Sequence, residues 1–404
     1  MAEDAVIVSG VRTPIGRAVK GSLAEMRADD LATIAVKEAL ERVPEVRPED
    51  VEDLMLGCGQ PAAEQGFNMA RVVAVLAGLT EVPGVTVNRY CASSLQTLRM
   101  AAHAIRAGEG ECFIVAGAEA ASRFDKGNAD RVPGTKNPLF DAAQERTARR
   151  AEGGAGPWEP NPGLPDVYIA MGQTAENVAE LEGVTREEAD EFAARSQQLA
   201  VARQEDGFFD AEIVPVRTPG GELVTRDDGP RPGTTVERLA ELKPVFRPDG
   251  RVTAGNACPL NDGAAALVVT SASFARSRGL RPLARVVATG VSALDPEIMG
   301  MGPVGATEAA LARAGMTVDD VDLFEINEAF AAQVIPSARR LGIEWDKLNV
   351  NGGAIALGHP FGMTGARLAI TLINALRARD ATIGLETMCV GGGQGMALIL
   401  ERLS

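Results

Sequence analysis

The sequence predicts an α/β fold built from two similar halves, with a loop-rich insertion between them. An apolar strand pattern over residues 4–9 is followed by a helical apolar face over 31–43 and a second strand pattern over 51–56. Strands that alternate with helices favour a largely parallel sheet covered by helices on both faces. The pattern recurs later in the chain, and a stretch of different composition separates the two occurrences.

Two sequence echoes in the same order indicate an internal duplication. Residues 46–54 (Val-Arg-Pro-Glu-Asp-Val-Glu-Asp-Leu) are echoed by residues 316–323 (Met-Thr-Val-Asp-Asp-Val-Asp-Leu). Later in each half, Val-Asn precedes a turn of small residues and then a long helix. We expect these helices over Ser93–Ala107 and Gly365–Ala378. Ordered repeats of this kind are typical of duplicated structural units.

The segment between the halves differs from them in amino-acid composition. Residues 124–165 are rich in Gly, Pro, Asn and charged residues and show little periodicity, which predicts an irregular loop region. Helices are expected from near Thr174 and over Arg186–Gln204. Long loops in compact proteins usually serve a function, so we favour a substrate-covering insertion over a plain surface excursion. The predicted units are residues 1–123 with 254–280 for the first half, 124–253 for the insertion and 281–404 for the second half.

Composition excludes several classes of function. The 404 residues carry a formal charge of -15, and a field of that sign repels nucleic acid and anionic lipid. The chain has no uncharged apolar run of about eighteen residues, and its acidic start is not a secretory signal. Its five cysteines are an odd number and form no C-x-x-C pair, which favours free thiols in the cytoplasm. With two histidines, a His-rich metal site is excluded, and we expect no metal.

Cys91 is the first candidate for covalent chemistry. It follows the β-branched run Val85–Val87 and stands just before the helix expected from Ser93. The N-terminus of a helix favours a thiolate, and its unpaired N–H groups can hold an oxyanion. The alternative interpretation is a small buried filler, which is what most single cysteines are.

His359 is the residue that can serve Cys91 as a base. It lies between Gly358 and Pro360 in a turn, whereas His103 lies in the middle of a helix. Cys389 precedes the triple glycine 391–393, whose backbone N–H groups can face an anion. A dinucleotide fingerprint is excluded there because the G-x-G-x-x-G spacing is absent. For Cys389 alone, a buried filler and a functional role are equally consistent with the pattern.

Taken together, four segments resemble the active-site motifs of the thiolases, in order and in spacing, along essentially the whole chain. They are Asn88-Arg89-Tyr90-Cys91, Asn327-Glu328-Ala329-Phe330, Gly358-His359-Pro360 and Cys389-Val390-Gly391-Gly392-Gly393. The resemblance implies duplicated α/β halves, layered α-β-α-β-α, with an inserted loop domain. It also implies a homodimer or homotetramer that acts on coenzyme A thioesters of the kind found in fatty-acid β-oxidation, without a tightly bound cofactor.

The resemblance assigns roles to individual residues. Cys91 would be acylated by a 3-ketoacyl-CoA or acetyl-CoA thioester while His359 takes its proton, and Cys389 would act as acid and base at the α-carbon. Asn327, through a water, and His359 would stabilise the enolate oxygen. The N–H groups of Cys91 and Gly391 would hold the oxyanion of the acylated cysteine. The residues expected to face coenzyme A and its acyl group are Arg231, Ala254, Cys258, Met171 and Phe330.

Three departures from the family pattern concern substrate binding. Ser94 stands where a glycine is common, Cys258 replaces a serine that bonds the pantetheine arm, and Ala170 replaces a histidine of acetoacetyl-specific members. The alternatives are a ketoacyl-synthase-type condensing enzyme, a non-catalytic lipid-carrier relative, and a redox switch between Cys91 and Cys389. The condensing enzyme would need a second active-site histidine, and His103 is badly placed to be one. A non-catalytic carrier would not need Cys91, His359 and Cys389, and all three are present.

Overall fold

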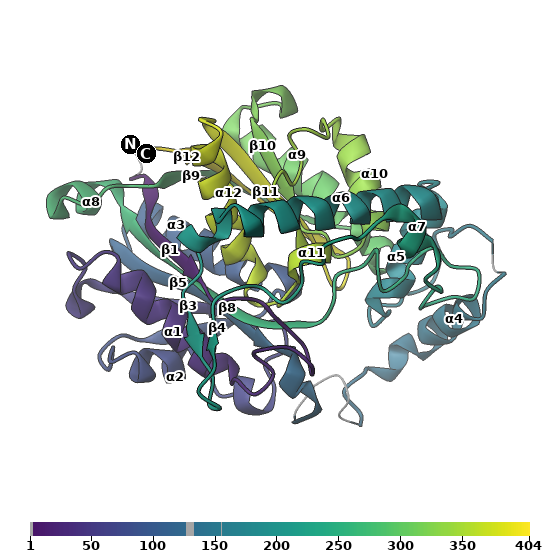
Figure 1. Cartoon of the computed structure of the whole chain (residues 1–404), viewed down its shortest axis with the longest axis horizontal. Helices are drawn as coiled ribbons and strands as arrows, with labels where there is room; N and C mark the ends of the chain where they lie inside the picture. The colour runs from purple at the N-terminus through teal and green to yellow at the C-terminus, as the bar shows by residue number, and fades with distance from the viewer. Residues whose placement is uncertain (1–2, 127–132, 155) are drawn as a thin grey trace.

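The strands form one mixed sheet whose two ends belong to different halves of the chain. The computed structural model describes residues 3–126, 133–154 and 156–404. In Figure 1 the first half lies at the lower left, the second half at the top, and the insertion extends to the right. The spatial order is β10 (Leu323–Ile326), β11 (Ile383–Val390), β12 (Gln394–Arg402), β9 (Ala284–Ala293), β1 (Ala5–Arg12), β8 (Asn261–Ser271), β5 (Cys112–Ala120), β3 (Asp53–Gly57) and β4 (Gly84–Val87), and β2 (Gly16–Arg17) pairs with β8.

The two half-sheets have the same topology. In the first half β3 runs parallel to β5, β5 antiparallel to β8, and β8 antiparallel to β1. In the second half the same relations hold for β10, β11, β12 and β9. The half-sheets join where β1 and β9 pair at Val6–Arg285 and Ile7–Ala284. The expected duplication is therefore present in the strand order itself.

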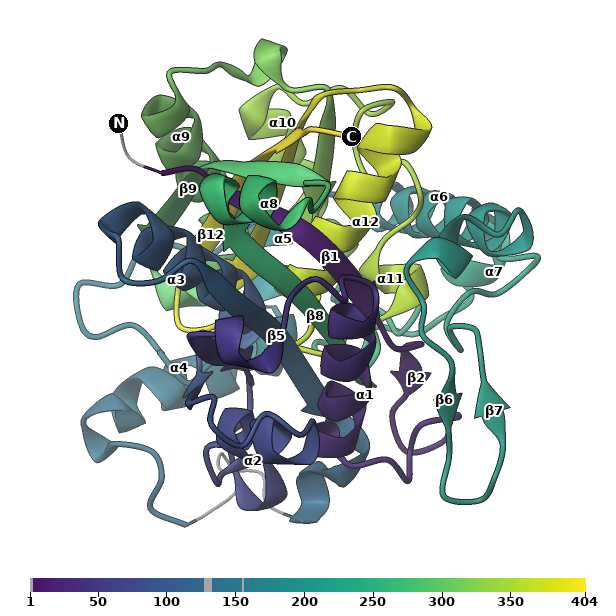
Figure 2. The same ribbon diagram turned by 90° about the vertical axis from the view of Figure 1, so that its left-hand side faces the viewer.

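Helices form three layers around the half-sheets. The long helices α3 (Ser93–Ala107) and α12 (Thr364–Ala378) contact each other and lie between the half-sheets. On the outer face of the first half lie α1 (Ala28–Glu41), seen in front of β8 in Figure 2, and α2 (Met69–Leu76). The second half is covered by α9 (Gly302–Ala314) and α10 (Ala331–Leu341). The layered α-β-α-β-α fold is thus confirmed.

Glycines let the two central helices approach their neighbours closely. A Cβ atom on Gly57 of β3 would lie 2.8 Å from the side chain of Ser93, and one on Gly365 would lie 2.8 Å from the Cα atom of Leu95. Such distances are shorter than van der Waals contact allows, so larger residues would push the layers apart. The abundance of small residues in this chain therefore serves the packing of α3 on β3 and of α12 on α3.

Most predicted helix positions are close to the structure, but the interpretation of the insertion is partly wrong. The helix at 93–107 agrees with the expected bounds, and α12 begins one residue before its expected start. Residues 124–165 were expected to be irregular, yet Asp141–Ala151 forms α4. Only Ala143 of α4 is buried, so the helix has no apolar periodicity to reveal it. Residues 127–132 and 155 of that segment lie outside the described residues.

The rest of the insertion packs on both halves, since Val216 and Val224 join the apolar core of the first half and Phe192 joins that of the second. Its longest helix is α6 (Arg186–Glu205), which begins with a capping box between Thr185 and Glu188. The other elements of the insertion are α5 (Met171–Leu181), β6 (Val216–Arg217), β7 (Leu223–Val224) and α7 (Val236–Ala240). Two short helices remain, α8 (Ala272–Arg278) in the first half and α11 (Ala354–Leu357) in the second. No helix within the described ranges is long and apolar enough to cross a membrane. The residue limits assigned to the three units stay a prediction.

A buried ion cluster ties the insertion to the first strand. The guanidinium of Arg12, at the end of β1, is fully buried and donates to Glu212 at 2.6 Å and to the two oxygens of Asp227 at 2.7 and 2.9 Å. Asp227 also accepts from the N–H group of Ile15 at 2.7 Å. Because both carboxylates belong to the insertion, the cluster fixes that segment beside β1.

Replacing Arg12 by Met is expected to lower the free energy of unfolding by about 3–5 kcal/mol, because two buried carboxylates lose their cation. The matched control is Arg149→Met, since Arg149 and Glu145 form an exposed pair on α4. That change should cost at most about 1 kcal/mol. Urea unfolding followed by circular dichroism measures both. Equal losses in the two variants would contradict the anchoring role of Arg12.

Candidate active site

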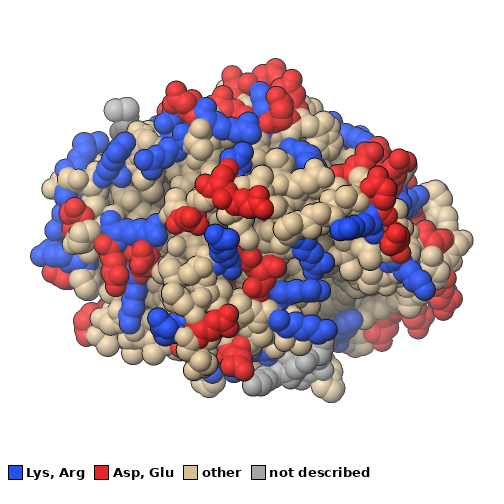
Figure 3. All heavy atoms as spheres, in the orientation of Figure 1, with Lys and Arg blue, Asp and Glu red and all other residues tan. Residues whose placement is uncertain are grey.

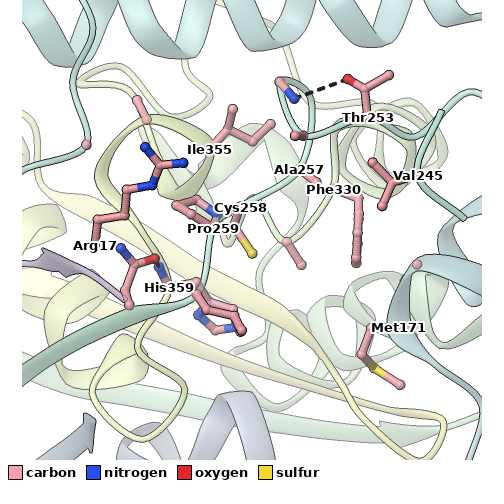
Figure 4. A pocket seen from close by; sticks show the side chains of 18 of the residues that line it. Arg17, Met171, Val245, Thr253, Ala257, Cys258, Pro259, Phe330, Ile355 and His359 are labelled. Carbon is pink, nitrogen blue, oxygen red and sulfur yellow. Dashed lines mark hydrogen bonds between the residues drawn. The ribbon is translucent and has the colours of Figure 1, made fainter. Parts of the chain in front are cut away.

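A cavity of about 730 Å³ lies where the insertion meets the two halves. Figure 4 shows His359, Cys258, Met171 and Phe330 around it. Seven of the ten residues predicted for the site line this cavity, namely Cys91, His359, Arg231, Ala254, Cys258, Met171 and Phe330. The fold therefore brings residues as far apart in the sequence as Cys91 and His359 to the same cavity.

The other three predicted residues lie directly behind the cavity wall. Asn327 contacts the His359 ring, with 3.3 Å between the amide Nδ2 and Nε2. The backbone N–H of Gly391 donates to the sulfur of Cys91. Cys389 is the next-to-last residue of β11, is fully buried, and lies within electrostatic reach of the sulfurs of Cys91 and Cys258. All ten predicted residues thus belong to one site.

A strained turn presents Cys91 at the start of α3. Strand β4 ends at Val87, and a short 3-10 turn covers Tyr90–Ala92 before the helix begins. Tyr90 has a φ of 43°, a left-handed conformation that is unfavourable for a bulky residue. The Ser93 hydroxyl holds this turn, because it donates to the Tyr90 carbonyl at 2.6 Å and accepts from the Arg89 N–H at 2.9 Å.

Hydrogen bonds determine which nitrogen of His359 is free to act as a base. The Thr364 hydroxyl donates to the Pro360 carbonyl at 2.8 Å, so it accepts from Nδ1–H of His359 at 2.6 Å. Nε2 then carries the lone pair and accepts from Asn327. The backbone N–H of His359 donates to Asn261 at 2.9 Å, which holds the loop on the first half. The ring is therefore oriented and in one tautomer.

The structure contradicts the expectation that Cys91 rests as a thiolate. Burial raises the pKa of Cys91 to about 11, against the opposite effect of the N–H groups of Gly391 and Cys91, and the Glu119 carboxylate raises it further. Burial and the positive charge of Arg367 lower the pKa of His359 to about 3. At neutral pH the pair is therefore a thiol and a neutral imidazole. Desolvation outweighs the helix N-terminus because the thiol is nearly inaccessible to water.

The other two cysteines of the site, Cys389 and Cys258, also rest as thiols. Burial raises the pKa of Cys389 well above its ordinary value, and a charge on Cys91 or Cys258 would raise it further. Burial raises the pKa of Cys258 as well, with Cys91 the next contribution. A protonated Cys389 is able to donate a proton to a carbanion beside Cys91. Cys258 is, with Cys91, the second thiol in the cavity wall.

Several residues of the site gave no signal in the sequence. Arg17 lines the cavity together with Arg231, and these two are the fully charged side chains among the described lining residues. Apolar walls come from segments far apart in the chain, including Leu239, Phe246 and Met299. Arg17 follows an ordinary turn, Arg-Thr-Pro-Ile-Gly, and no pattern distinguishes it. Thr364, which sets the tautomer of His359, belongs to no motif in the sequence.

The fold and the site define an enzyme that carries an acyl group on cysteine, and comparison with known proteins gives the same class. The models of the thiolase N-terminal and C-terminal domains match residues 5–273 and 280–402. A 3-ketoacyl-CoA thiolase of Aeromonas hydrophila is 44% identical, over 99% of this chain and 100% of its own length. A 3-oxoadipyl-CoA/3-oxo-5,6-dehydrosuberyl-CoA thiolase of Escherichia coli is also 44% identical, with the same coverage.

A solved structure agrees with these sequence matches. Human mitochondrial 3-ketoacyl-CoA thiolase in complex with CoA is 35% identical and superposes with a TM-score of 0.86, over 100% of this chain and 98% of that one. The chain belongs to the thiolase family and is an acyltransferase. The resemblance inferred from four short motifs is thereby confirmed.

Alkylation of Cys91 by iodoacetamide is expected to accelerate with pH through the range from 7 to 10 without a plateau, because the thiol has its pKa near 11. The rate is measured by intact mass, and Cys91→Ala shows the labelling of the other four cysteines. A rate that is constant from pH 6 to 9 would show a resting thiolate and contradict the neutral pair.

Proposed function

We propose that the chain catalyses the reversible thiolysis of 3-ketoacyl-CoA by coenzyme A, which yields acyl-CoA and acetyl-CoA. The reverse reaction is a Claisen condensation, and acetoacetyl-CoA is one expected substrate. The observation that carries the proposal is that Cys91 and His359 line the same cavity while Nδ1–H of His359 is bound to Thr364, which leaves the lone pair on Nε2. A covalent acyl-cysteine divides the reaction into two easier steps.

In the first step, the sulfur of Cys91 attacks the 3-keto carbon while Nε2 of His359 takes its proton. The carbon–carbon bond then breaks, and its electron pair forms the enolate of acetyl-CoA. Cys389 donates a proton to the α-carbon of that enolate, which releases acetyl-CoA and leaves the acyl group on Cys91. In the second step the thiol of a new coenzyme A attacks the acyl group and gives its proton to the Cys389 thiolate. The bond between the acyl carbon and Cys91 breaks, and the sulfur of Cys91 takes back the proton held by His359. Since one product leaves before the second substrate reacts, ping-pong kinetics are expected.

Two sets of donors support the anionic states of this reaction. Asn327 and His359 lie side by side and would serve the enolate oxygen. The N–H groups of Cys91 and Gly391 point at the sulfur of Cys91 and would serve the oxyanion on the attached carbon. Buried dipoles of this kind are strong because no water competes with them.

The cavity suits a long thioester with an anionic end. The overall charge is -15, and Lys and Arg side chains are interspersed with Asp and Glu at the lower centre of the face in Figure 3. Arg17 and Arg231 line the cavity and would pair with the phosphates, while its apolar walls would cover the pantetheine arm and the acyl chain. The cavity size permits acyl groups longer than acetyl. The relatives are named for 3-ketoacyl-CoA and 3-oxoadipyl-CoA, which makes these thioesters the substrates to test first.

The proposal predicts different defects for the two catalytic cysteines. Cys91→Ala should abolish thiolysis of acetoacetyl-CoA and form no acyl adduct. Cys389→Ala should also lose thiolysis, by at least about 100-fold for a lost general acid, yet still be acylated by acetyl-CoA, because transfer between thioesters needs no carbon acid. Intact mass and a coupled CoA assay measure these effects. Cys112→Ala, in β5, is the matched control and should remain active.

The opposite pattern would refute these roles. A Cys389→Ala variant that forms no adduct would make Cys389 part of the acylation step. Residual thiolysis in Cys91→Ala would remove Cys91 from the reaction. Rates of the unmodified enzyme across chain lengths of 3-ketoacyl-CoA, including 3-oxoadipyl-CoA, would then decide which acyl group it prefers.

We also propose that the protein forms a homodimer through β4. This strand is the last in the order of described strands, so its outer edge is open to pairing with a second copy. The adjoining surface is apolar, since Phe67 is 83% exposed and Val75 and Leu76 are also exposed. Asn68 joins this surface to β4 by donating to the Gly84 carbonyl at 2.8 Å. A tetramer would need a second contact, and the five free thiols suit a reducing compartment such as the cytoplasm.

Phe67→Glu is expected to shift the protein from dimer to monomer, because a charge would be buried at the centre of the proposed interface. Light scattering after size exclusion measures the mass. Leu139→Glu is the matched control, since Leu139 is similarly exposed at 73% but lies in the insertion. A Phe67→Glu protein that stays dimeric at micromolar concentration would place the interface elsewhere.

A further inference from the structure

Glu119 is a buried carboxylate beside the active site that neither the motifs nor the proposed chemistry uses. It is the next-to-last residue of β5 and is fully buried. Its oxygens accept from the N–H groups of Gly59 at 2.7 Å, Gly362 at 2.9 Å and Gln60 at 3.2 Å, and from the side-chain amide of Gln65 at 2.9 Å. A carboxylate with this many donors is tightly held.

These donors come from both halves of the chain. Gly59 and Gln60 follow β3, and their loop is tied to the strand that leads to Cys91 because the Cys58 N–H donates to the Val87 carbonyl at 3.0 Å. Gly362 belongs instead to the loop of His359. Phe361 precedes Gly362 in that loop, and its ring packs edge-on against the imidazole of His359, with 5.1 Å between the ring centroids. One carboxylate therefore holds the loop that carries the base to the loop that supports the nucleophile.

The His359 loop packs closely against the first half. A Cβ atom on Gly362 would lie 2.6 Å from the Gly57 carbonyl oxygen, so the loop rests directly on the ends of the first-half strands. On Gly59, a Cβ atom would lie 2.7 Å from the Cβ of Phe361. The two glycines allow this close contact. The Glu119 carboxylate accepts hydrogen bonds from N–H groups that would otherwise be buried without acceptors.

The duplication gives a second and independent reason to assign Glu119 a role. Glu119 and Cys389 are the next-to-last residues of equivalent strands, and both face a glycine in the neighbouring antiparallel strand, Gly263 and Gly395. Cys91 and Gly362 each stand two positions before the start of an equivalent central helix, α3 or α12. The two residues proposed to react, Cys91 of the first half and Cys389 of the second, thus correspond to Gly362 of the second half and Glu119 of the first.

We infer that Glu119 is a positioning residue, whose carboxylate clamps the His359 loop of the second half to the Cys91 side of the first half. The inference rests on the proposed function, because the clamp is defined by the Cys91–His359 pair. All partners of Glu119 are donors, and their hydrogen bonds favour the ionised form against burial, which raises the pKa of Glu119. Proton transfer from Cys91 depends on the distance to Nε2 of His359, and the clamp maintains that distance through both steps.

Glu119→Gln is the sharpest test, because it keeps the size of the side chain and removes its charge. Its amide NH₂ would face donors, which loosens the loop. We expect kcat for acetoacetyl-CoA thiolysis to fall roughly 10- to 100-fold, as for a small misplacement of a catalytic group, with KM for coenzyme A within about twofold. Glu297→Gln, which alters another buried carboxylate that accepts two N–H groups, is the matched control and should keep its activity.

A second readout separates the clamp from general support of the fold. The charge of Glu119 raises the pKa of Cys91, so the alkylation profile of Cys91 in Glu119→Gln should shift to lower pH. In Glu119→Asp the charge remains but the carboxylate is retracted, so kcat should fall while the alkylation profile stays near that of the unmodified protein. If Glu119→Gln fails to fold, the Glu119→Asp variant decides.

Two results would overturn the inference. One is a Glu119→Gln protein with unchanged kcat and an unchanged alkylation profile. The other is a Glu119→Asp protein with full kcat. Failure of the proposed function is distinguishable from both, because it would appear as absent thiolysis and absent acyl adduct in the unmodified enzyme, whereas the alkylation profiles still report whether Glu119 acts on Cys91.

Discussion

The structure depends on the contact between the two central helices, α3 and α12. Each fills the space between the half-sheets, and each begins at the active site, α3 just after Cys91 and α12 just after the His359 loop. Their first turns touch, because Gly365 leaves room for the backbone of Leu95 and the Ala366 N–H donates to the Ser94 hydroxyl at 2.9 Å. Ser94, which departs from the family pattern, is therefore part of this contact. A larger residue at Gly365 would separate the nucleophile from its base.

Burial sets the electrostatics of the site. Cys91 and His359 are almost inaccessible to water, so desolvation disfavours both charged forms and keeps the pair neutral until a thioester arrives. The buried carboxylate of Glu119 and the guanidinium of Arg367 act in the same direction, on Cys91 and on His359 respectively. Charge then develops only when the sulfur attacks, where fixed N–H groups are ready to accept it.

Duplication explains why one chain can hold such a site. Two copies of a β-α-β unit place equivalent strand ends and helix starts opposite one another, and the two copies have since taken different tasks. Each pair of equivalent positions holds one of the two cysteines, Cys91 or Cys389, in one copy and a group that joins the halves, the Gly362 backbone or the Glu119 carboxylate, in the other. The inserted segment, anchored by Arg12, supplies the wall on which the thioester would lie.

The sequence by itself determined the fold class and the repeat and predicted which residues react, because helix periodicity and short motifs are local properties of the chain. Counting histidines was enough to pair His359 with Cys91. Tertiary structure alone decided the protonation of that pair, since burial cannot be read from neighbours in sequence and here reverses the expected thiolate. It also brought Arg17, Thr364 and Glu119 to the site and formed α4, whose exposed charged surface carries no apolar pattern.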